Sequence, residues 1–305
     1  MDVFRFQYEH NTVYQQYANS LNVRIGNVKS IQEIPFLPIE FHKNHTIKST
    51  NFEAEKIYKS SGTGDIGRSK HHVADNDFYL RHALNLFTQY YGPIEDFIII
   101  AVLPSYQEQG DSSLISMVDY FINKSANDLS GYYLGKPEEI ASLLPKLNQS
   151  GKKVLFLGVT YALLELADSK PDLSGLIVME TGGMKGRGRE MIREELHAHL
   201  CASFNVDSIH SEYGMTELLS QAYSKGKGYF RLPKSMKIII RDVNDPFHYV
   251  SNDKTGGINI IDLANVNSCS FIETKDLGRS LDGDFYEIMG RFDNSDLRGC
   301  NLLLV

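Results

Sequence analysis

Between residues 75 and 204, segments with helical periodicity alternate with short apolar runs. Residues 77–91 have helical spacing and end at Gly92-Pro93, and residues 97–103 form an apolar run typical of a strand that is buried on both faces. The alternation continues with predicted helices at 112–123, 137–147 and 161–167 and predicted strands at 131–134, 153–158 and 176–180. This order predicts an α/β fold with a mostly parallel sheet.

The pattern changes after one more predicted helix, at residues 189–204. The later apolar segments are short, as strands are: 236–241, 258–262, 269–274, 285–289 and 302–305. We therefore predict an α/β core over residues 1–225 and a β-rich part over residues 226–305, divided near the glycines at 226 and 228. Residues 1–54 stay unassigned.

Composition narrows the class of protein. The 305 residues are 42% hydrophobic, which is enough for a sizeable core, and the formal net charge is −7. Such a chain is not expected to bind nucleic acid non-specifically, because that binding needs clustered Lys and Arg. The N-terminal residues lack the apolar core of a signal peptide, and no segment has the length of a membrane span. We expect a cytoplasmic protein with reduced cysteines and no nucleic-acid or membrane partner.

The stretch Ser60-Ser61-Gly62-Thr63-Gly64 combines hydroxyl side chains with glycines. Glycine tolerates positive φ and allows close approach, so several backbone N–H groups can point at one phosphate. The GxxxxGK[ST] order of a Walker loop is absent. Taken alone, the stretch predicts a phosphate clamp and an ordinary surface loop about equally. The nearby His71-His72 pair can contact a phosphate or a substrate carboxylate, or simply face solvent.

A second motif, Ser211-Glu212-Tyr213-Gly214-Met215-Thr216-Glu217, follows much later in the chain. Tyr213 can stack on a nucleobase, and Glu217 can hold the magnesium ion that accompanies ATP. An isolated Tyr-Gly pair is more often a buried tyrosine in a turn. Together the two motifs predict a chain that activates a carboxylate with ATP.

These motifs and three others follow the order of the adenylate-forming enzymes. Ser60-Ser61-Gly62-Thr63-Gly64 resembles the phosphate loop of that superfamily, and Tyr213-Gly214-Met215-Thr216-Glu217 matches its YGxTE motif. Gly182-Gly183 resembles the glycine pair beside the adenine. Thr274-Lys275-Asp276 resembles the ribose-binding motif, and Gly290-Arg291-Phe292-Asp293 resembles the GRxD hinge.

The closer resemblance is to the acyl-protein synthetases of bacterial bioluminescence, the LuxE or long-chain-fatty-acid luciferin-component ligases. Phenylacetate-CoA ligases are more distant relatives. This resemblance extends over about residues 55–305. It is carried by residues 180–187, by residues 211–217 and by the stretch Arg298-Gly299-Cys300-Asn301-Leu302.

The resemblance implies an adenylate-forming fold, ATP and Mg²⁺ as cofactors and a carboxylic acid, fatty in this family, as the substrate. Thr216 would contact the α-phosphate, and Glu217 would bind the metal. The nucleotide-binding residues that it implies are Ser60, Ser61, Gly62, Thr63, Gly64, Gly182, Gly183, Tyr213, Gly214, Asp276 and Arg291. No general base is required, because a carboxylate is already ionised at pH 7.

Cys300 is the thiol to which the resemblance assigns chemistry. In the acyl-protein synthetases a cysteine near the C-terminus is acylated, and Cys300 occupies the corresponding place. The sequence continues for five residues beyond it, so we expect the usual C-terminal lysine domain to be lacking. Arg298 would favour the thiolate. Without the resemblance, Cys300 would be interpreted as a buried residue at the start of a strand.

Two other functions remain open at this stage. One is a truncated ligase that transfers the acyl group to coenzyme A or to a carrier-protein thiol, with Cys300 structural. The other is a nucleotide- or acyl-binding protein that has lost catalysis. The family resemblance also suggests an acyl-reductase as the partner. The sequence leaves the acyl chain length, the final acceptor and the oligomeric state open.

Overall fold

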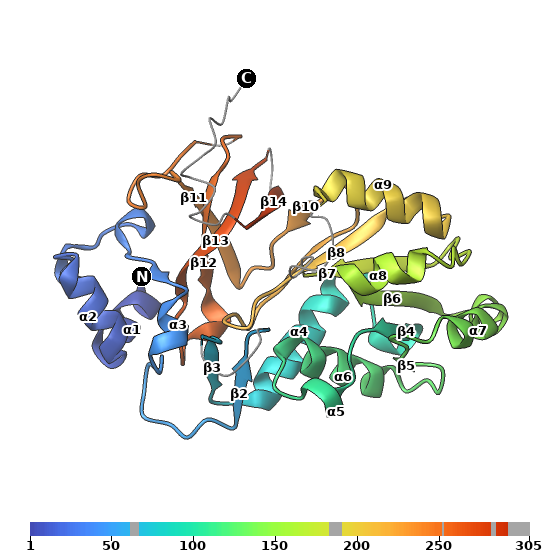
Figure 1. Cartoon of the computed structure of the whole chain (residues 1–305). Helices are drawn as coiled ribbons and strands as arrows, with labels where there is room; N and C mark the ends of the chain where they lie inside the picture. Colours follow the sequence, from blue (N-terminus) through green and yellow to red (C-terminus); the bar gives the residue numbers. More distant parts are fainter. Residues whose placement is uncertain (62–66, 183–190, 252, 282–284, 292–305) are drawn as a thin grey trace.

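A computed structural model of the chain describes residues 1–61, 67–182, 191–251, 253–281 and 285–291. Within these residues one long sheet has the strand order β11-β12-β13-β14-β10-β9-β8-β7-β6-β4-β5, with β1 added beside β13. Parallel strands make up one end of this sheet, and antiparallel strands make up the other (Figure 1). A separate two-stranded sheet, β2-β3, lies below the junction.

The parallel end is built from the alternating segments of the middle of the chain. Its strands pair in parallel in the order β8-β7-β6-β4-β5. They are β4 (Phe97–Val102), β5 (Gly131–Tyr132), β6 (Lys153–Val159), β7 (Ile177–Thr181) and β8 (Ile209–Tyr213). Every residue of β4 is buried, as expected for an apolar strand that is covered by helices on both faces.

Helices cover both faces of the parallel strands. In Figure 1, α8 and α9 lie above the sheet, and α4 and α6 lie below it. The helices of this part are α4 (Asn76–Tyr91), α5 (Tyr106–Gln109), α6 (Ser113–Ser125), α7 (Pro137–Gln149), α8 (Thr160–Ala167) and α9 (Arg193–Phe204), with the 3₁₀ turn η3 (Ile94–Asp96). One hydrophobic core joins these helices to the strands.

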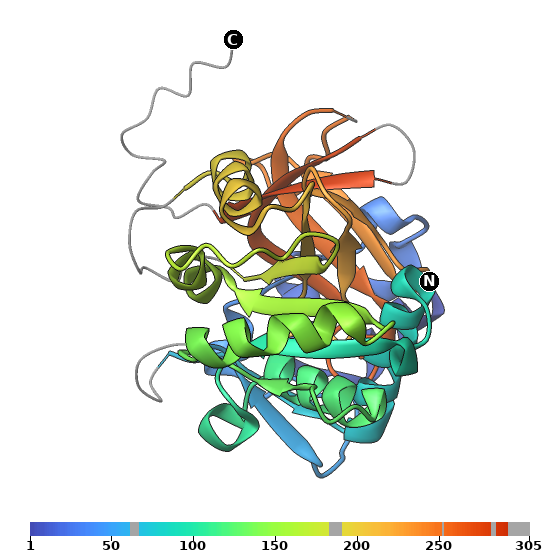
Figure 2. The ribbon, with the colours of Figure 1, turned by 90° about the vertical axis from the view of Figure 1, so that its right-hand side faces the viewer.

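The antiparallel end is formed by the last third of the chain. Its strands are β9 (Ala222–Ser224), β10 (Tyr229–Arg231), β11 (Met236–Arg241), β12 (Gly256–Asp262), β13 (Phe271–Ser280) and β14 (Phe285–Arg291), with the turn η4 (Leu263–Asn265) after β12. Seen from the side, the orange and red strands continue the sheet away from the helix-covered part (Figure 2). Strand β8 pairs in parallel with β7 and antiparallel with β9, so the sheet changes type at β8.

The first fifth of the chain forms a helical layer on the antiparallel strands. It contains α1 (Asp2–His10), α2 (Thr12–Ser20), η1 (Ile25–Asn27), η2 (Ile31–Glu33), β1 (Leu37–Pro38) and α3 (Phe41–Asn44). Phe4 and Tyr14 are fully buried there, and their rings pack against Phe271 of β13. The chain then enters the hairpin of β2 (Lys56–Lys59) and β3 (Lys70–Val73).

The predicted fold class is confirmed: an α/β sheet that is parallel first and antiparallel towards the C-terminus. The helix predicted for residues 189–204 begins at Arg193 among the described residues, and the predicted strand 302–305 lies outside them. The sheet continues through residues 222–231, so the division near residue 225 stays a prediction.

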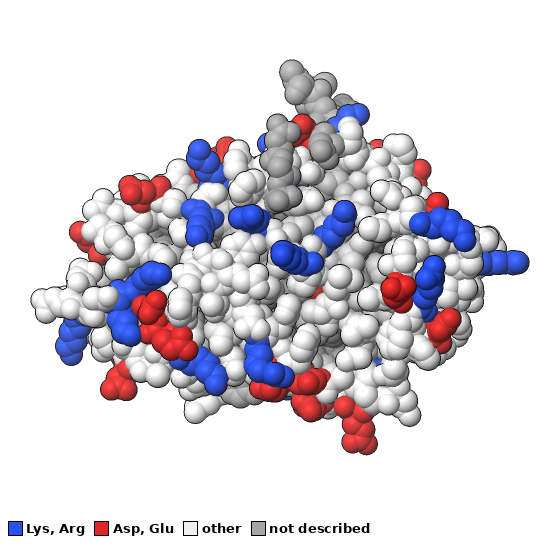
Figure 3. Space-filling model, turned by 180° about the vertical axis from the view of Figure 1, so that it is seen from behind, with Lys and Arg blue, Asp and Glu red and all other residues white. Residues whose placement is uncertain are grey.

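The described helices include none that is long and apolar enough to cross a membrane. Over the rear face of the molecule, Lys and Arg side chains are interspersed with Asp and Glu (Figure 3).

Candidate functional site

The carboxyl ends of the neighbouring parallel strands β7 and β8 bring two of the predicted motifs together. Thr181, the last residue of β7, lies beside Glu212 of β8 in the strand register, and Thr181 Oγ1 donates a hydrogen bond to Glu212 Oε2. Gly182 follows Thr181 directly, and its carbonyl accepts a hydrogen bond of 2.7 Å from Thr160 Oγ1 at the start of α8. The carboxyl ends of parallel strands are the usual ligand-binding edge of such sheets.

Tyr213 ends β8 and reaches across to the antiparallel strands. Its hydroxyl donates a 2.6 Å hydrogen bond to Asp276 Oδ2, and Arg291 Nε lies 3.4 Å from the other carboxylate oxygen. Asp276 on β13 and Arg291 on β14 are partners in the strand register. Burial, with the Asp276 charge second, raises the pKa of Tyr213 well above its usual value, so the phenol keeps its proton. The structure thus brings together Tyr213, Asp276 and Arg291.

Asp276 keeps acceptor positions within this cluster. Its side chain is 8% exposed, and a carboxylate offers about four acceptor positions. Tyr213 occupies one position and Arg291 faces another, so capacity remains for two hydroxyl groups. The Tyr213 ring packs edge-on against Phe230, with ring centroids 6.0 Å apart, which supports the phenol from behind.

The carboxyl group of Glu212 leaves room only for glycine at position 214. A Cβ atom on Gly214 would lie 2.5 Å from Glu212 Oε1, so the carboxyl group occupies the space that any larger residue would need. Glu212 is buried, and desolvation raises its pKa from 4.5 to about 7, with the nearby charge of Glu180 adding to the shift. Glu180 itself lies 3.7 Å from Arg193 and 3.6 Å from His197 on α9. Sequence reasoning did not identify Glu212.

The loop that was predicted to bind phosphate begins at the tip of the β2–β3 hairpin. Ser60 N donates to Ser69 O at 3.1 Å, and Ser69 N donates to Ser60 Oγ at 2.9 Å, so the hairpin closes at this pair. Arg68 Nε donates to Ser60 O at 2.5 Å, and its Nη1 lies 3.3 Å from Asp111 Oδ2, so an ion-paired guanidinium lies beside Ser60. Ser61 is exposed. The predicted residues Gly62, Thr63 and Gly64 lie outside the described residues.

Thr216 and Glu217 lie against the same hairpin. His71 of β3 contacts the Thr216 carbonyl through Nδ1 at 2.8 Å, and Asn265 Nδ2 donates to the Glu217 carbonyl at 2.7 Å. The Glu217 side chain is 4% exposed. His71 is itself 1% exposed, so it neither faces solvent nor reaches out towards a phosphate. It holds the backbone of the motif, a role that its place in the sequence did not reveal.

A single carboxylate suits magnesium in a nucleotide site, because Mg²⁺ keeps most of its waters and binds the phosphates. No group of three His, Cys, Asp or Glu side chains that could bind a metal occurs in the described part of the chain. Magnesium at Glu217 stays a prediction, and it would use the arrangement with a single protein carboxylate.

Some residues that the sequence analysis discussed are not part of the described site. Gly183 and Cys300 lie outside the described residues. Cys201 is half-buried and packs against the main core, as expected for its place on the apolar stripe of α9. Cys269 is fully buried, and desolvation raises the pKa of its thiol to about 12.

Neither a family model nor a curated protein matches this sequence. Solved structures do match its fold. ATP-bound MatB from Rhodopseudomonas palustris superposes with a TM-score of 0.56 at 14% identity, covering 77% of this chain and 47% of MatB. An ATP-bound RpMatB–BxBclM chimera gives 0.57 at 16% identity over the same shares. The chain thus spans about half the length of these proteins.

A CoA ligase superposes over nearly the whole chain. This protein is 2-hydroxyisobutyryl-CoA ligase in complex with 2-HIB-AMP and CoA, in its thioesterification state. The TM-score is 0.70 at 13% identity, covering 96% of this chain and 66% of the ligase. The open conformation of the same enzyme gives 0.67 at 11% identity. The chain thus shares the fold of 2-hydroxyisobutyryl-CoA ligase over the part of that protein that it spans.

Proposed function

We propose that this protein activates a carboxylic acid with ATP to form an acyl-adenylate. The observation that carries the proposal is the convergence of three separate motifs at the junction of the parallel and antiparallel strands. The hairpin at Ser60 is joined to Thr216 by His71, and Tyr213 is joined to Asp276. These contacts support a site in which phosphate, metal, base and ribose would be bound side by side, and the fold is shared with ATP-bound MatB.

The proposed reaction joins two anions. A carboxylate oxygen attacks the α-phosphorus, the new O–P bond forms, and the bond to the β-phosphate breaks to release pyrophosphate. The Ser60 hairpin with Arg68 would hold the phosphates, and Thr216 would contact the α-phosphate. Magnesium, when bound at Glu217, supplies positive charge that offsets charge on the phosphates. The main contribution of the protein is therefore positioning and electrostatic stabilisation.

The thiol that takes the acyl group is a further part of the proposal. In the acyl-protein synthetase scheme the thiolate of Cys300 attacks the acyl carbon, the thioester bond forms and AMP leaves. The acyl group would then pass to a partner such as a reductase. The comparisons favour a second candidate, transfer to coenzyme A, because the superposed 2-hydroxyisobutyryl enzyme is a CoA ligase.

Carboxylate-dependent exchange of label between pyrophosphate and ATP tests the adenylation step. We expect exchange with at least one acid in a series from acetate to long-chain fatty acids, in the presence of magnesium. Glu217→Gln should shift the magnesium requirement to higher concentration, because a neutral amide binds Mg²⁺ more weakly than a carboxylate. Glu165→Gln, at an exposed position on α8, is the matched control. Wild-type protein without exchange for any acid would refute the proposal.

A labelling experiment separates the two acceptors. With radiolabelled acid and ATP, acylation of Cys300 leaves label on the protein that hydroxylamine removes and that Cys300→Ser abolishes. Cys201→Ser is the control thiol. If the label instead appears only on added coenzyme A, and Cys300→Ser has no effect, the CoA ligase is the correct assignment.

A further inference from the structure

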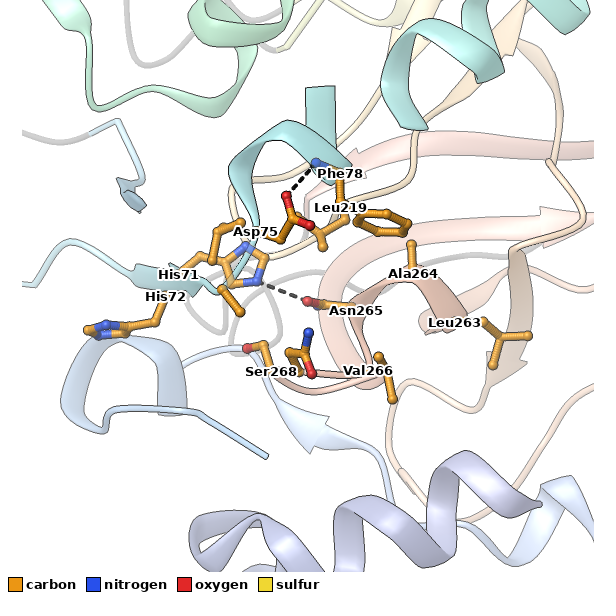
Figure 4. Close-up of a pocket in the computed structure, with 13 residues that line it drawn as sticks. His71, His72, Asp75, Phe78, Leu219, Leu263, Ala264, Asn265, Val266 and Ser268 are labelled. Atoms are coloured by element: carbon orange, nitrogen blue, oxygen red, sulfur yellow. Dashed lines mark hydrogen bonds between the residues drawn. The ribbon is translucent and has the colours of Figure 1, made fainter. Parts of the chain in front are cut away.

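His71 lies in a fully enclosed position directly after the hairpin loop. It belongs to β3 and pairs with Tyr58 of β2 in the strand register, so the hairpin fixes its backbone. Its ring extends between two segments that are far away in sequence. Nδ1 lies 2.8 Å from the Thr216 carbonyl oxygen. Nε2 lies 2.9 Å from Asn265 Oδ1, and Figure 4 draws this contact as a dashed line.

Asn265 continues the chain of contacts to the next residue of the motif. It ends η4, is 1% exposed, and donates from Nδ2 to the carbonyls of Glu217 at 2.7 Å and Cys269 at 2.9 Å. These two acceptors determine which way its amide points, and Oδ1 therefore faces His71. The carbonyls of the consecutive residues Thr216 and Glu217 are thus bound by side chains from two separate elements: His71 of β3 and Asn265 of η4.

We propose that His71 and Asn265 are positioning residues that fix the backbone of Thr216 and Glu217 for the metal–nucleotide complex. This inference rests on the proposed function. The Thr216 carbonyl and Asn265 Oδ1 are both acceptors, so a neutral ring can donate to one of them only. We assign the proton to Nδ1, which donates to Thr216, and Nε2 then faces Asn265 Oδ1 without donating to it. The hydrogen bond at Thr216 and the one at Glu217 fix both peptide groups, and so aim the Thr216 hydroxyl and the Glu217 carboxylate. Groups that orient a metal ligand from outside typically contribute about 10- to 100-fold to metal affinity or activity.

A cavity behind the pair makes the idea testable. Its volume is about 240 Å³, and it is lined by His71 and Asn265 together with Val73, Phe78 and Leu219 among others (Figure 4). Shortening His71 to alanine would therefore enlarge an existing cavity that a small molecule can enter. Cavities made by truncating a side chain can bind a small ring of matching shape. Added imidazole can then replace the lost ring beside Thr216.

Substitutions at His71 give the first test. For each variant, calorimetry measures the Kd of Mg·ATP, and exchange of label between pyrophosphate and ATP measures adenylation. Loss of an outer partner of this kind is worth about 10- to 100-fold in affinity or activity, so His71→Leu should weaken Mg·ATP binding by about that factor. His71→Asn places an amide donor near the position of Nδ1 and should retain most of the affinity. His71→Gln places its donor towards Asn265 and should behave like the leucine variant.

His199→Leu is the control histidine, because His199 is exposed on α9. It should bind Mg·ATP as the wild type does. His71→Ala should regain affinity on addition of imidazole, whereas His199→Leu should not respond. Urea unfolding of each variant shows whether it is folded, and rescue by imidazole distinguishes loss of positioning from loss of the fold.

The outcomes separate this inference from the function on which it rests. Wild-type protein that neither binds Mg·ATP nor catalyses exchange overturns the proposed function, and the positioning role with it. Active wild-type protein overturns the positioning role alone if His71→Leu binds Mg·ATP equally well. The positioning role is also overturned if the His71→Asn and His71→Gln variants bind Mg·ATP with equal affinity. It is overturned as well if imidazole does not restore the affinity of His71→Ala.

Discussion

The buried carboxyl group of Glu212 predicts how stability depends on pH. Glu212 is 8% exposed, and desolvation raises its pKa from 4.5 to about 7. A carboxyl group with a raised pKa in the folded state stabilises the fold only while it is protonated. Its contribution is fully present below about pH 4.5, declines as the pH rises through 7, and is absent above that.

The magnitude follows from the difference between the two pKa values. A difference of about 2.5 units at about 1.4 kcal/mol each corresponds to roughly 3 kcal/mol of unfolding free energy. Other groups titrate over the same range, so wild-type protein alone cannot reveal this contribution. Glu212→Gln removes the titration and keeps an acceptor for Thr181. The difference between wild type and variant isolates the effect.

Urea unfolding followed by far-UV circular dichroism between pH 4.5 and 8 measures this difference. The stability of the wild type relative to Glu212→Gln should fall by about 3 kcal/mol over that range, mostly below pH 7. The matched control for the substitution itself is Glu165→Gln, at an exposed carboxyl group on α8. A pH-independent difference between wild type and Glu212→Gln would refute the reasoning that the carboxyl group is desolvated.

Two further predictions concern the motif that follows Glu212. Gly214→Ala places a Cβ atom 2.5 Å from Glu212 Oε1 and should cost about 1–3 kcal/mol in urea unfolding, whereas Gly26→Ala, which meets nothing within 4 Å, should not. Tyr213→Phe removes the hydrogen bond to Asp276 and should destabilise the protein by about 1.5–3 kcal/mol, as for other hydrogen bonds to charged groups. Unchanged urea midpoints would contradict either prediction.

The regular part of the fold could be predicted because its pattern is local. Residues 97–102 are apolar throughout, and this strand is buried on both faces, as the run predicted. Strand β8 was missed because residues 209–213 include the polar Ser211 and Glu212, which do not show the alternation or apolar run of a strand. They form a strand because β7 on one side and β9 on the other satisfy their backbone groups.

The candidate site shows the same division. The motifs at Ser60, Tyr213 and Asp276 could be recognised in the sequence because each is a short run of particular residues. The role of His71 could not, since its partner Thr216 is 145 positions away and no local pattern marks the contact. The N-terminal helices were also unassigned, because their apolar faces pack on β13, at the other end of the chain.

The sequence by itself determined the α/β class, the change to strands near the C-terminus and the chemical groups present in the candidate site. These depend on periodicity and residue type, which act over a few residues. Only the tertiary structure decided which groups meet: Tyr213 with Asp276, Thr216 with His71 and Glu217 with Asn265. The reason is that the order of strands in the sheet, set by burial of the whole core, brings together segments that are distant in the chain.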